Sequence, residues 1–343
     1  MAGITVMGGG IFGLALAWEL ARRGARPRLI ERRRIGAGAS GGLVGALAPH
    51  APENWTETKA FQLDALLMAG AFWAEVARIG GSDPGYARTG RLQPVTEAGL
   101  DRARARGAQA AELWRGQAQW RLRRVDDMTG LTPLTPTGLV IEDTLSARIH
   151  PRRALAALAA AAQAAGAEII ENASARPAPG DRVIHATGHE GLTAAGLGGG
   201  VKGQALTLRL AAPDAPQLYA DGLHIVPHVD GTVAIGSTSE RDFDAPDTTD
   251  AQLDAVHARA VATCAALAGA PVVERWAGVR PRAQSRSPVL GPLPDQDSAY
   301  IFNGGFKIGF ALAPRLAQIM ADLILDGHDA IPAAFRPLRA DRS

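Results

Sequence analysis

The stretch ITVMGGGIFGLALAWELARRG, residues 4–24, decides the fold. It begins with a short apolar run, continues through three glycines, and then carries an amphipathic helical pattern from about Ile11 to Arg23 that ends at Gly24. This order predicts a buried strand, a tight turn and a helix closed by a glycine. Residues 27–31 (PRLIE) predict a second buried strand, so the stretch opens a βαβ unit.

Gly8, Gly10 and Gly13 have the spacing of a dinucleotide-binding turn and lie between the expected strand and helix. In such a turn the first glycine allows the sharp bend, the second lets backbone approach a pyrophosphate, and the third lets the helix pack closely on the strand. Free N–H groups at the helix N-terminus then bind the phosphates. Glu31 ends the second strand, where a carboxylate accepts hydrogen bonds from ribose hydroxyls. A purely structural glycine turn is the alternative, and the placed acid argues against it.

Three arginines at residues 32–34 follow Glu31. They would suit a 2′-phosphate and hence NADP, but we favour a solvated basic strand end. Two further segments favour FAD over a nicotinamide cofactor. Residues 37–49 (AGASGGLVGALAP) form a long loop of small residues, and residues 183–188 (VIHATG) form a buried strand that ends in small residues. A flat ring system needs such close approach of backbone, whereas a nicotinamide enzyme needs neither segment.

The composition is that of an ordinary globular protein, with 343 residues, 47% hydrophobic and 20% charged. A formal net charge of +2 with scattered arginines argues against nucleic acid as a partner. The chain has a single cysteine, Cys264, which excludes an internal disulfide and is consistent with a reducing cytoplasm. The sequence also contains no spacing of His, Asp or Glu residues that is typical of a metal site. The N-terminal segment lacks the basic start of a signal peptide, and the apolar run at residues 152–168 is too short to cross a membrane. We therefore expect a cytoplasmic protein without a membrane span.

The rest of the chain alternates between helical and β patterns, so two interleaved domains are expected. Residues 201–239 have a β pattern, with a hairpin predicted at Asp230-Gly231, and a last strand is expected at residues 300–302. Helical patterns occupy residues 60–80, 101–117, about 150–166, about 250–268 and about 314–325.

A series of motifs occurs in the order found in a known family. They are GGGIFGLALAWELARRG (8–24), GASGGLVGALAP (38–49), GRL (90–92), IHPRRALAAL (149–158), AEIIENA (167–173), VIHATG (183–188), KGQALTL (202–208), HIVPHVDGTVAIGST (224–238), RWAGVRP (275–281) and GGFKIGFALAP (304–314). With these motifs the sequence resembles the D-amino-acid oxidase superfamily of flavoproteins, and within it the glycine oxidases. The resemblance covers nearly the whole length.

This resemblance implies an α/β fold in which a Rossmann-type FAD-binding domain is interleaved with an α+β substrate domain built on a mixed or antiparallel β-sheet. It also implies non-covalently bound FAD and oxidation of the C–N bond of a small amine or amino acid, with hydride passing to flavin N5. The electrons then go to O₂ or to another acceptor.

On the same resemblance, residues 1–85, 150–200 and 275–343 would form the FAD-binding domain, and residues 86–149 and 201–274 the substrate domain. The residues expected to bind FAD come from the glycine turn, the ribose acid, the small-residue loop, the nucleotide-facing strand ends and the C-terminal motif. They are Gly8, Gly10, Ile11, Phe12, Gly13, Glu31, Arg32, Ala39, Ser40, Gly45, Ala46, Leu47, Ala175, Ala186, Thr187, Gly188, Gly305, Phe306, Lys307, Ile308 and Gly309.

Three residues are expected at the reacting end. Arg280 matches the family arginine that holds the substrate carboxylate, and its planar guanidinium suits that task; an interdomain salt bridge is the alternative. Lys307, in GGFK, matches a lysine of sarcosine oxidases near the flavin and the substrate carboxylate; an outward-pointing lysine is the alternative. His224 takes the position of the family tyrosine, where it would hydrogen-bond the substrate, act as a base, or have a structural role. His228 replaces a family arginine and is expected at the rim, and His50 is a weaker candidate for the wall.

Gly304-Gly305 also replaces the Gly-His pair of the family. These departures from the family motifs leave the identity of the substrate open. Cys264 lies too far upstream to tether the flavin as in sarcosine oxidases. Rival interpretations are a dehydrogenase of the same fold that reduces a quinone or carrier, a flavin-binding subunit of a larger complex, and a nicotinamide dehydrogenase. The sequence is compatible with a homo-oligomer.

Overall fold

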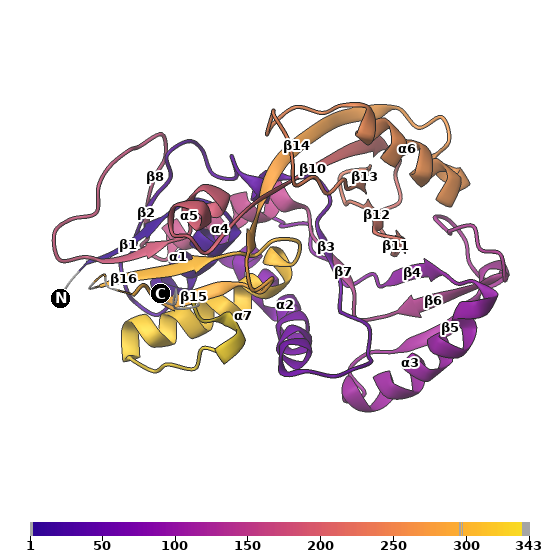
Figure 1. Ribbon diagram of the computed structural model, residues 1–343, viewed down its shortest axis with the longest axis horizontal. Coiled ribbons are helices and arrows are strands. Elements are labelled where there is room, and N and C mark those ends of the chain that lie inside the picture. The colour runs from indigo at the N-terminus through magenta and orange to yellow at the C-terminus, as the bar shows by residue number, and fades with distance from the viewer. Residues whose placement is uncertain (1–2, 295, 297, 338–343) are drawn as a thin grey trace.

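The computed structural model of the chain describes residues 3–294, 296 and 298–337. Two large sheets lie toward opposite ends of the molecule, each covered by its own helices, and the chain crosses between them several times (Figure 1). One sheet is largely parallel and the other is mixed, which confirms the predicted fold class.

A six-stranded sheet carries the βαβ unit predicted from the opening stretch. Its strands are β1 (Ile4–Met7), β2 (Arg28–Ile30), β8 (Glu168–Ile170), β9 (Arg182–His185), β15 (Val289–Pro292) and β16 (Ala299–Asn303). They run in the order β15-β16-β9-β1-β2-β8, and neighbours are parallel except for β15 and β16. The glycine turn thus leaves the middle of the sheet at the carboxyl end of β1, where open parallel sheets bind ligands.

An eight-stranded mixed sheet forms the second part. Its strands are β4 (Arg91–Pro94), β5 (Trp120–Arg124), β6 (Leu139–Asp143), β10 (Gly198–Arg209), β11 (Gln217–Ala220), β12 (Leu223–Pro227), β13 (Thr232–Gly236) and β14 (Val272–Ala283). They run in the order β14-β10-β13-β12-β11-β4-β6-β5, and only β11 and β4 are a parallel pair among these described neighbours. The hairpin predicted at Asp230-Gly231 is confirmed, because it joins the antiparallel strands β12 and β13. A separate short ribbon pairs β3 (Ala46–Leu47) with β7 (Ala147–Arg148).

The helices pack mostly on the first sheet. They are α1 (Ile11–Arg22), α2 (Glu57–Gly80), α3 (Leu100–Leu113), α4 (Pro151–Ala164), α5 (Gly188–Ala194), α6 (Ala251–Thr263) and α7 (Gly309–Ala321). Helices α1 and α2 both pack against α4 and α7 in a core rich in alanine and leucine. Helix α5 contacts the ends of the long strands β10 and β14, which extend from the second sheet toward the first (Figure 1).

Helix α2 is long and apolar enough, by length and composition alone, to cross a membrane. In the fold it is a core helix, because Leu63, Leu66 and Trp73 are buried and the helix packs against α4 and α7. Thr56 caps its N-terminus and Gly81 ends it in a left-handed conformation. This packing accounts for its apolar character.

Several helix boundaries differ from the prediction: α2 begins at Glu57 and not at residue 60, α6 ends at Thr263 and not near residue 268, and α7 and α3 differ as well. The sequence places Pro314 at the start of the last helix, whereas α7 begins at Gly309 and holds Pro314 inside it. The turn after GGFK is already helical, since the N–H of Leu312 donates to the carbonyl oxygen of Ile308. Helix α3 ends at Leu113 instead of continuing to residue 117, because residues 115 and 116 adopt φ of +52° and +68°.

Strand β14 bears on the predicted domain division. It pairs with β10 in the eight-stranded sheet as far as Ala283, beyond the boundary expected at residue 275. The predicted domain division as a whole stays a prediction, and residues 1–2 and 338–343 at the two ends lie outside the described residues.

Candidate active site

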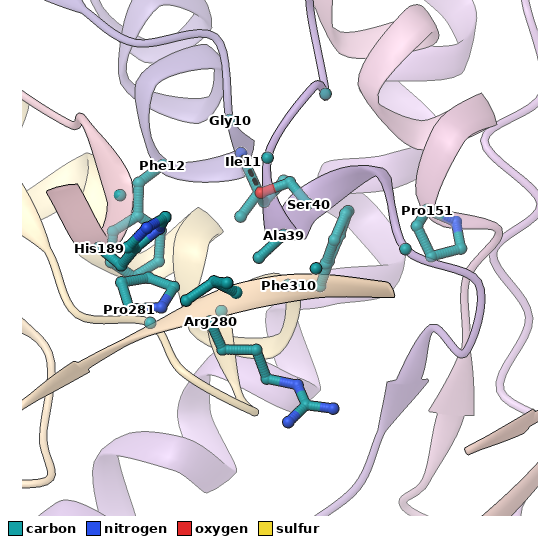
Figure 2. A pocket seen from close by; sticks show the side chains of 18 of the residues that line it. Gly10, Ile11, Phe12, Ala39, Ser40, Pro151, His189, Arg280, Pro281 and Phe310 are labelled. Carbon is teal, nitrogen blue, oxygen red and sulfur yellow. Dashed lines mark hydrogen bonds between the residues drawn. The ribbon is translucent and has the colours of Figure 1, made fainter. Parts of the chain in front are cut away.

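A cavity of about 950 Å³ joins segments that are far apart in the sequence. Its wall includes the glycine turn, the loop at residues 36–50, the strand β14 and the segment 303–311. Figure 2 shows the glycine turn and Ser40 on one side of β14 and the Arg280 guanidinium on the other side. The opening glycines and the C-terminal motif therefore share one cavity, which has one end at the glycine turn, where the nucleotide is expected, and a second end around Arg280.

The glycine turn has no room for side chains. Gly8 has φ of +110°, and a Cβ there would overlap the carbonyl oxygen of Ala186. A Cβ at Gly13 would overlap the carbonyl oxygen of Gly8, because the helix lies directly on the turn. The two outer glycines thus have the turn and packing functions that the spacing predicts.

The N-terminus of α1 faces the cavity. Gly10, at the N-cap, has no side chain to bond the first N–H groups of the helix. The N–H of Ile11 donates to Oγ of Ser40 at 3.0 Å, drawn as a dashed line in Figure 2. A pyrophosphate fits such a helix end, because N–H groups and the helix dipole both favour an anion there.

Glu31 lies on the cavity wall where the sequence predicts a ribose-binding acid. Its carboxylate accepts hydrogen bonds from the N–H of Gly9 at 2.7 Å and from the N–H of Arg33 at 2.8 Å. These bonds fix the carboxylate while leaving lone pairs for hydroxyl donors. Arg32 is exposed and pairs with Glu190 at 2.8 Å, which agrees with a solvated strand end.

Arg280 brings an enclosed positive charge to the other end of the cavity. Nη2 donates to Oγ of Ser237 at 2.6 Å, and Nη1 donates to the carbonyl oxygen of Thr238 at 3.3 Å. Burial lowers the pKa of Arg280 to about 10, against the opposing effect of nearby Glu240, so the guanidinium is charged at neutral pH. No carboxylate in the described part of the chain forms a salt bridge with it. An enclosed cation without an anionic partner suits the binding of an anionic ligand.

Lys307 and His224 line the same cavity. Nζ of Lys307 lies 5.6 Å from the centroid of the Phe306 ring, and the residue as a whole is exposed. Partial desolvation of its amine, followed by the charge of Arg280, lowers the pKa of Lys307. Burial, followed by the charges of Arg91, Lys307 and Arg280, lowers the pKa of His224 to about 3. The imidazole is therefore neutral at ordinary pH and a poor proton acceptor. Of the roles expected for His224, hydrogen bonding suits this environment better than base catalysis.

The cavity brings together nearly all the residues predicted for the site. Those on its wall are Gly8, Gly10, Ile11, Phe12, Glu31, Arg32, Ala39, Ser40, Gly45, Ala46, Ala175, Ala186, Thr187, Gly188, His224, Arg280, Gly305, Phe306, Lys307, Ile308 and Gly309, together with His50.

Three predicted positions differ. Gly13 lies beneath the turn and does not line the cavity. Leu47 is fully buried in the hydrophobic core, because side chains alternate along β3 and Ala46 takes the cavity side. His228 is buried instead of at the rim: it is 1% exposed, and its Nε2 lies 2.9 Å from the carbonyl oxygen of Leu43. His228 therefore contacts the backbone of the loop at residues 36–50 from the interior of the protein.

Sequence reasoning missed Tyr219 and Arg91. Tyr219 on β11 is directly opposite His224 on β12, with ring centroids 4.9 Å apart, so a tyrosine is present beside the histidine that replaces the family tyrosine. The Cζ atom of Arg91 lies 5.4 Å from the centroid of the Tyr219 ring. The turn at Asp221-Gly222 was the available signal, because a two-residue hairpin loop sets this pairing. Arg91 lies in the GRL motif at residues 90–92, which marks this segment but gives the arginine no role.

Trp276 on β14 adds an aromatic side chain to the site. It lies on the cavity wall, and its ring is 3.1 Å from the position of a Cβ on Gly42. The indole therefore packs against the small-residue loop, which explains why that loop needs a glycine at this point.

Comparison with known proteins agrees with this arrangement. A family model described as FAD dependent oxidoreductase (DAO) matches residues 3–323. A glycine oxidase from Pseudomonas aeruginosa is 29% identical over 370 residues, which cover 97% of this chain and 98% of that protein. The crystal structure of a glycine oxidase from Bacillus cereus has a TM-score of 0.83 at 20% identity and covers 100% of both chains. The crystal structure of an L-proline dehydrogenase from P. horikoshii has a TM-score of 0.78 at 19% identity and covers 98% of this chain and 96% of that one.

Proposed function

The chain belongs to the DAO family of FAD-dependent oxidoreductases, and we propose that it oxidises the C–N bond of a small amino acid or amine of the glycine, sarcosine or D-amino-acid type. It is an enzyme of the FAD-dependent amino-acid oxidase family. One observation carries the choice of substrate: the enclosed, charged guanidinium of Arg280 faces the same cavity as the glycine turn. An amino acid supplies the carboxylate that this guanidinium lacks.

The residues at the nucleotide end fit FAD. The cradle of Gly8 and Gly10, the N-terminus of α1 and Ser40 would hold the pyrophosphate, and Glu31 would hold the ribose. When bound, FAD supplies the hydride acceptor of the reaction.

We propose that the cofactor is held non-covalently. The single cysteine, Cys264, is 1% exposed in the core of the eight-stranded sheet and is not among the residues of the cavity wall. Acid precipitation of the yellow protein should release all of its flavin into the supernatant. Flavin that stays with the precipitated chain after washing would contradict this proposal.

Arg280, Lys307 and His224 prepare the substrate for hydride loss. Arg280 binds the carboxylate through the positive charge of its guanidinium and so sets the direction of the α-carbon. The positive charges of Arg280 and Lys307 lower the pKa of a bound ammonium group. This favours the neutral amine, whose lone pair assists loss of hydride from the adjacent carbon. His224 is neutral, so it can accept a hydrogen bond from that amine without adding a further charge.

A dehydrogenase of the same fold is the second candidate. The observation in its favour is that an L-proline dehydrogenase shares the fold over nearly the whole chain. Both candidates predict reduction of the flavin by an amino acid, and they differ in how fast air reoxidises it. A flavin-binding subunit of a larger complex predicts no turnover by the isolated chain.

Anaerobic mixing of the purified protein with glycine, sarcosine, proline and D-amino acids tests the proposal. We expect at least one of these compounds to bleach the flavin absorbance near 450 nm. Rapid return of the colour in air identifies an oxidase, and slow return that is accelerated by a quinone identifies a dehydrogenase. If the whole panel leaves the flavin oxidised, the proposed function is wrong.

A further inference from the structure

Arg91 brings a second guanidinium to the cavity wall. It is the first residue of β4, which pairs with β11, the strand that carries Tyr219. The residue is 6% exposed, and its Cζ lies 5.4 Å from the centroid of the Tyr219 ring. Arg91 thus enters the cavity from the eight-stranded sheet, on a different strand from Arg280.

The contacts of Arg91 leave part of the guanidinium free. Nε donates to Oδ2 of Asp143 at 2.7 Å, and Asp143 is fully buried. The other oxygen of Asp143 accepts a hydrogen bond from the N–H of Ser146 at 2.8 Å. Within the described residues, none accepts a hydrogen bond from Nη1 or Nη2 of Arg91. Asp143 therefore fixes the guanidinium through Nε and leaves the edge with the two terminal nitrogens for a planar acceptor with two oxygens.

The charges around His224 also favour a ligand with more than one negative group. Arg91, Lys307 and Arg280 all act on this one imidazole, and Arg91 has the largest effect of the three. Asp143 neutralises Arg91, whereas Arg280 and Lys307 form no salt bridge within the described part of the chain. Glu240, the carboxylate that acts on Arg280, pairs with Lys202 at 3.5 Å, so the cavity carries an excess of positive charge near His224. A ligand with two negative groups balances this excess better than a ligand with one.

We propose that Arg91, with the Tyr219 ring against its guanidinium, is a second carboxylate-binding residue and that the substrates are amino acids with two carboxylates. Arg280 holds the carboxylate next to the reacting carbon, and Arg91 holds the distant one. The inference rests on the proposed function, because it names the substrate class of the same site. D-Aspartate, D-glutamate and N-carboxymethyl amino acids have this chemistry.

A neutral substrate of the same size would bind less well. It would leave the two terminal nitrogens of Arg91 without an anionic acceptor in a largely buried environment. A site that hydrogen-bonds a charged group of its substrate discriminates strongly against analogues without that group. The competing explanation is that the pair of Arg91 and Asp143 merely joins β4 to β6. The two explanations differ in whether a change at Arg91 affects all substrates equally.

Matched substrates and two variants separate these explanations. The substrate pairs are D-glutamate with D-glutamine, and iminodiacetate with sarcosine. Arg91→Lys keeps the positive charge beside Asp143 and removes the two-nitrogen edge. The double variant Arg91→Met with Asp143→Asn removes both charges and so leaves no unpaired buried carboxylate. The new amide oxygen at residue 143 can still accept a hydrogen bond from the N–H of Ser146. This double variant serves as the test if Arg91→Lys does not fold.

The wild-type protein should have a higher kcat/KM for the dicarboxylate member of each pair. Either variant should lower kcat/KM for D-glutamate and iminodiacetate by about 10- to 100-fold, as expected for the loss of a charge-assisted hydrogen bond. The same variants should lower kcat/KM for D-glutamine and sarcosine by a clearly smaller factor, because these substrates lack the second carboxylate that Arg91 would hold. Equal losses for both members of a pair would overturn the inference and leave a structural ion pair.

Ligand binding gives a readout that does not depend on turnover. Succinate should raise the melting temperature of the wild-type holoenzyme more than butyrate does at the same concentration, and Arg91→Lys should abolish the difference. If no amino acid is oxidised but succinate still stabilises through Arg91, the proposed function fails and the anion site stands. If glycine or sarcosine is oxidised while dicarboxylates neither react nor stabilise, the inference fails and the proposed function stands.

Discussion

The guanidinium of Arg280 lies directly against the backbone of Gly203, and a Cβ at Gly203 would overlap both of its terminal nitrogens. Gly203 belongs to β10, the strand that pairs with β14 and so carries the neighbouring side of the site. Because residue 203 is a glycine, the guanidinium can lie close enough to Ser237 and Thr238 to form its hydrogen bonds with them. The conformation of the proposed carboxylate anchor therefore depends on the absence of one methyl group.

Gly203→Ala should displace the Arg280 side chain and weaken carboxylate binding. We expect KM for the amino-acid substrate to rise about 10-fold or more, because the loss of one charge-assisted hydrogen bond has that effect. The flavin absorbance spectrum and the flavin content should stay unchanged. Gly199→Ala on the same strand is the matched control, since a Cβ there meets nothing within 4 Å. Equal KM values for the two variants would show that Gly203 does not position Arg280.

Gly13→Ala should reduce FAD binding. The added methyl group would overlap the carbonyl oxygen of Gly8 and push α1 away from the turn that is expected to hold the pyrophosphate. The ratio of absorbance at 450 nm to that at 280 nm measures flavin content, and added FAD should restore less thermal stability to the variant than to the wild-type apoprotein. Gly70→Ala on α2 is the control, because its Cβ would make only an ordinary contact with Tyr86. Full flavin content in Gly13→Ala would contradict the predicted turn.

Stability should decrease below pH 6.5. Burial lowers the pKa of His228 to about 4 and that of His224 to about 3, so between these values and 6.5 the unfolded chain binds protons that the folded chain does not. The free energy of unfolding should therefore fall as the pH drops, by about 1.4 kcal/mol per pH unit for each such histidine. Thermal denaturation at pH 7.5, 6.0 and 5.0 measures this loss.

His228→Gln isolates one of the two contributions. The glutamine amide can donate to the carbonyl oxygen of Leu43 in place of Nε2 and does not titrate. The variant should lose less stability than the wild-type protein between pH 7.5 and 5.0. His328→Gln, at an exposed position, should behave like the wild type. An identical pH dependence in all three proteins would show that His228 does not carry the effect.

The nucleotide end of the site could be predicted from the sequence because it depends on local backbone geometry. Gly8 must adopt positive φ, Glu31 must end the next strand, and both requirements are visible within one βαβ unit. The resemblance placed Leu47 at the cofactor, although its side chain is buried in the core. The local helix rules placed the start of α7 too late, because Pro314 suggested a first turn.

The substrate end could be predicted only in part. Arg280 was found through a motif, whereas Tyr219 and Arg91 reach the cavity through strand pairing in the eight-stranded sheet. The pairing register of two strands that are distant in the chain cannot be predicted from local sequence. Strands β4 and β11 lie more than a hundred residues apart in the chain. For the same reason the burial of His228 beneath Leu43 depends on a loop that comes from the other end of the chain.

The central claim is that Arg280 holds the carboxylate of an amino-acid substrate. Its most direct test is the anaerobic rate of flavin reduction by wild-type protein and by Arg280→Met, measured with an accepted amino acid and with the amine that lacks its carboxylate. The account predicts that Arg280→Met slows reduction by the amino acid at low concentration by about 100-fold or more, the effect of removing a charged contact to its carboxylate. Reduction by the amine should slow far less, because the amine has no carboxylate for Arg280 to hold. Equal rates of amino-acid oxidation by the two proteins would contradict the account.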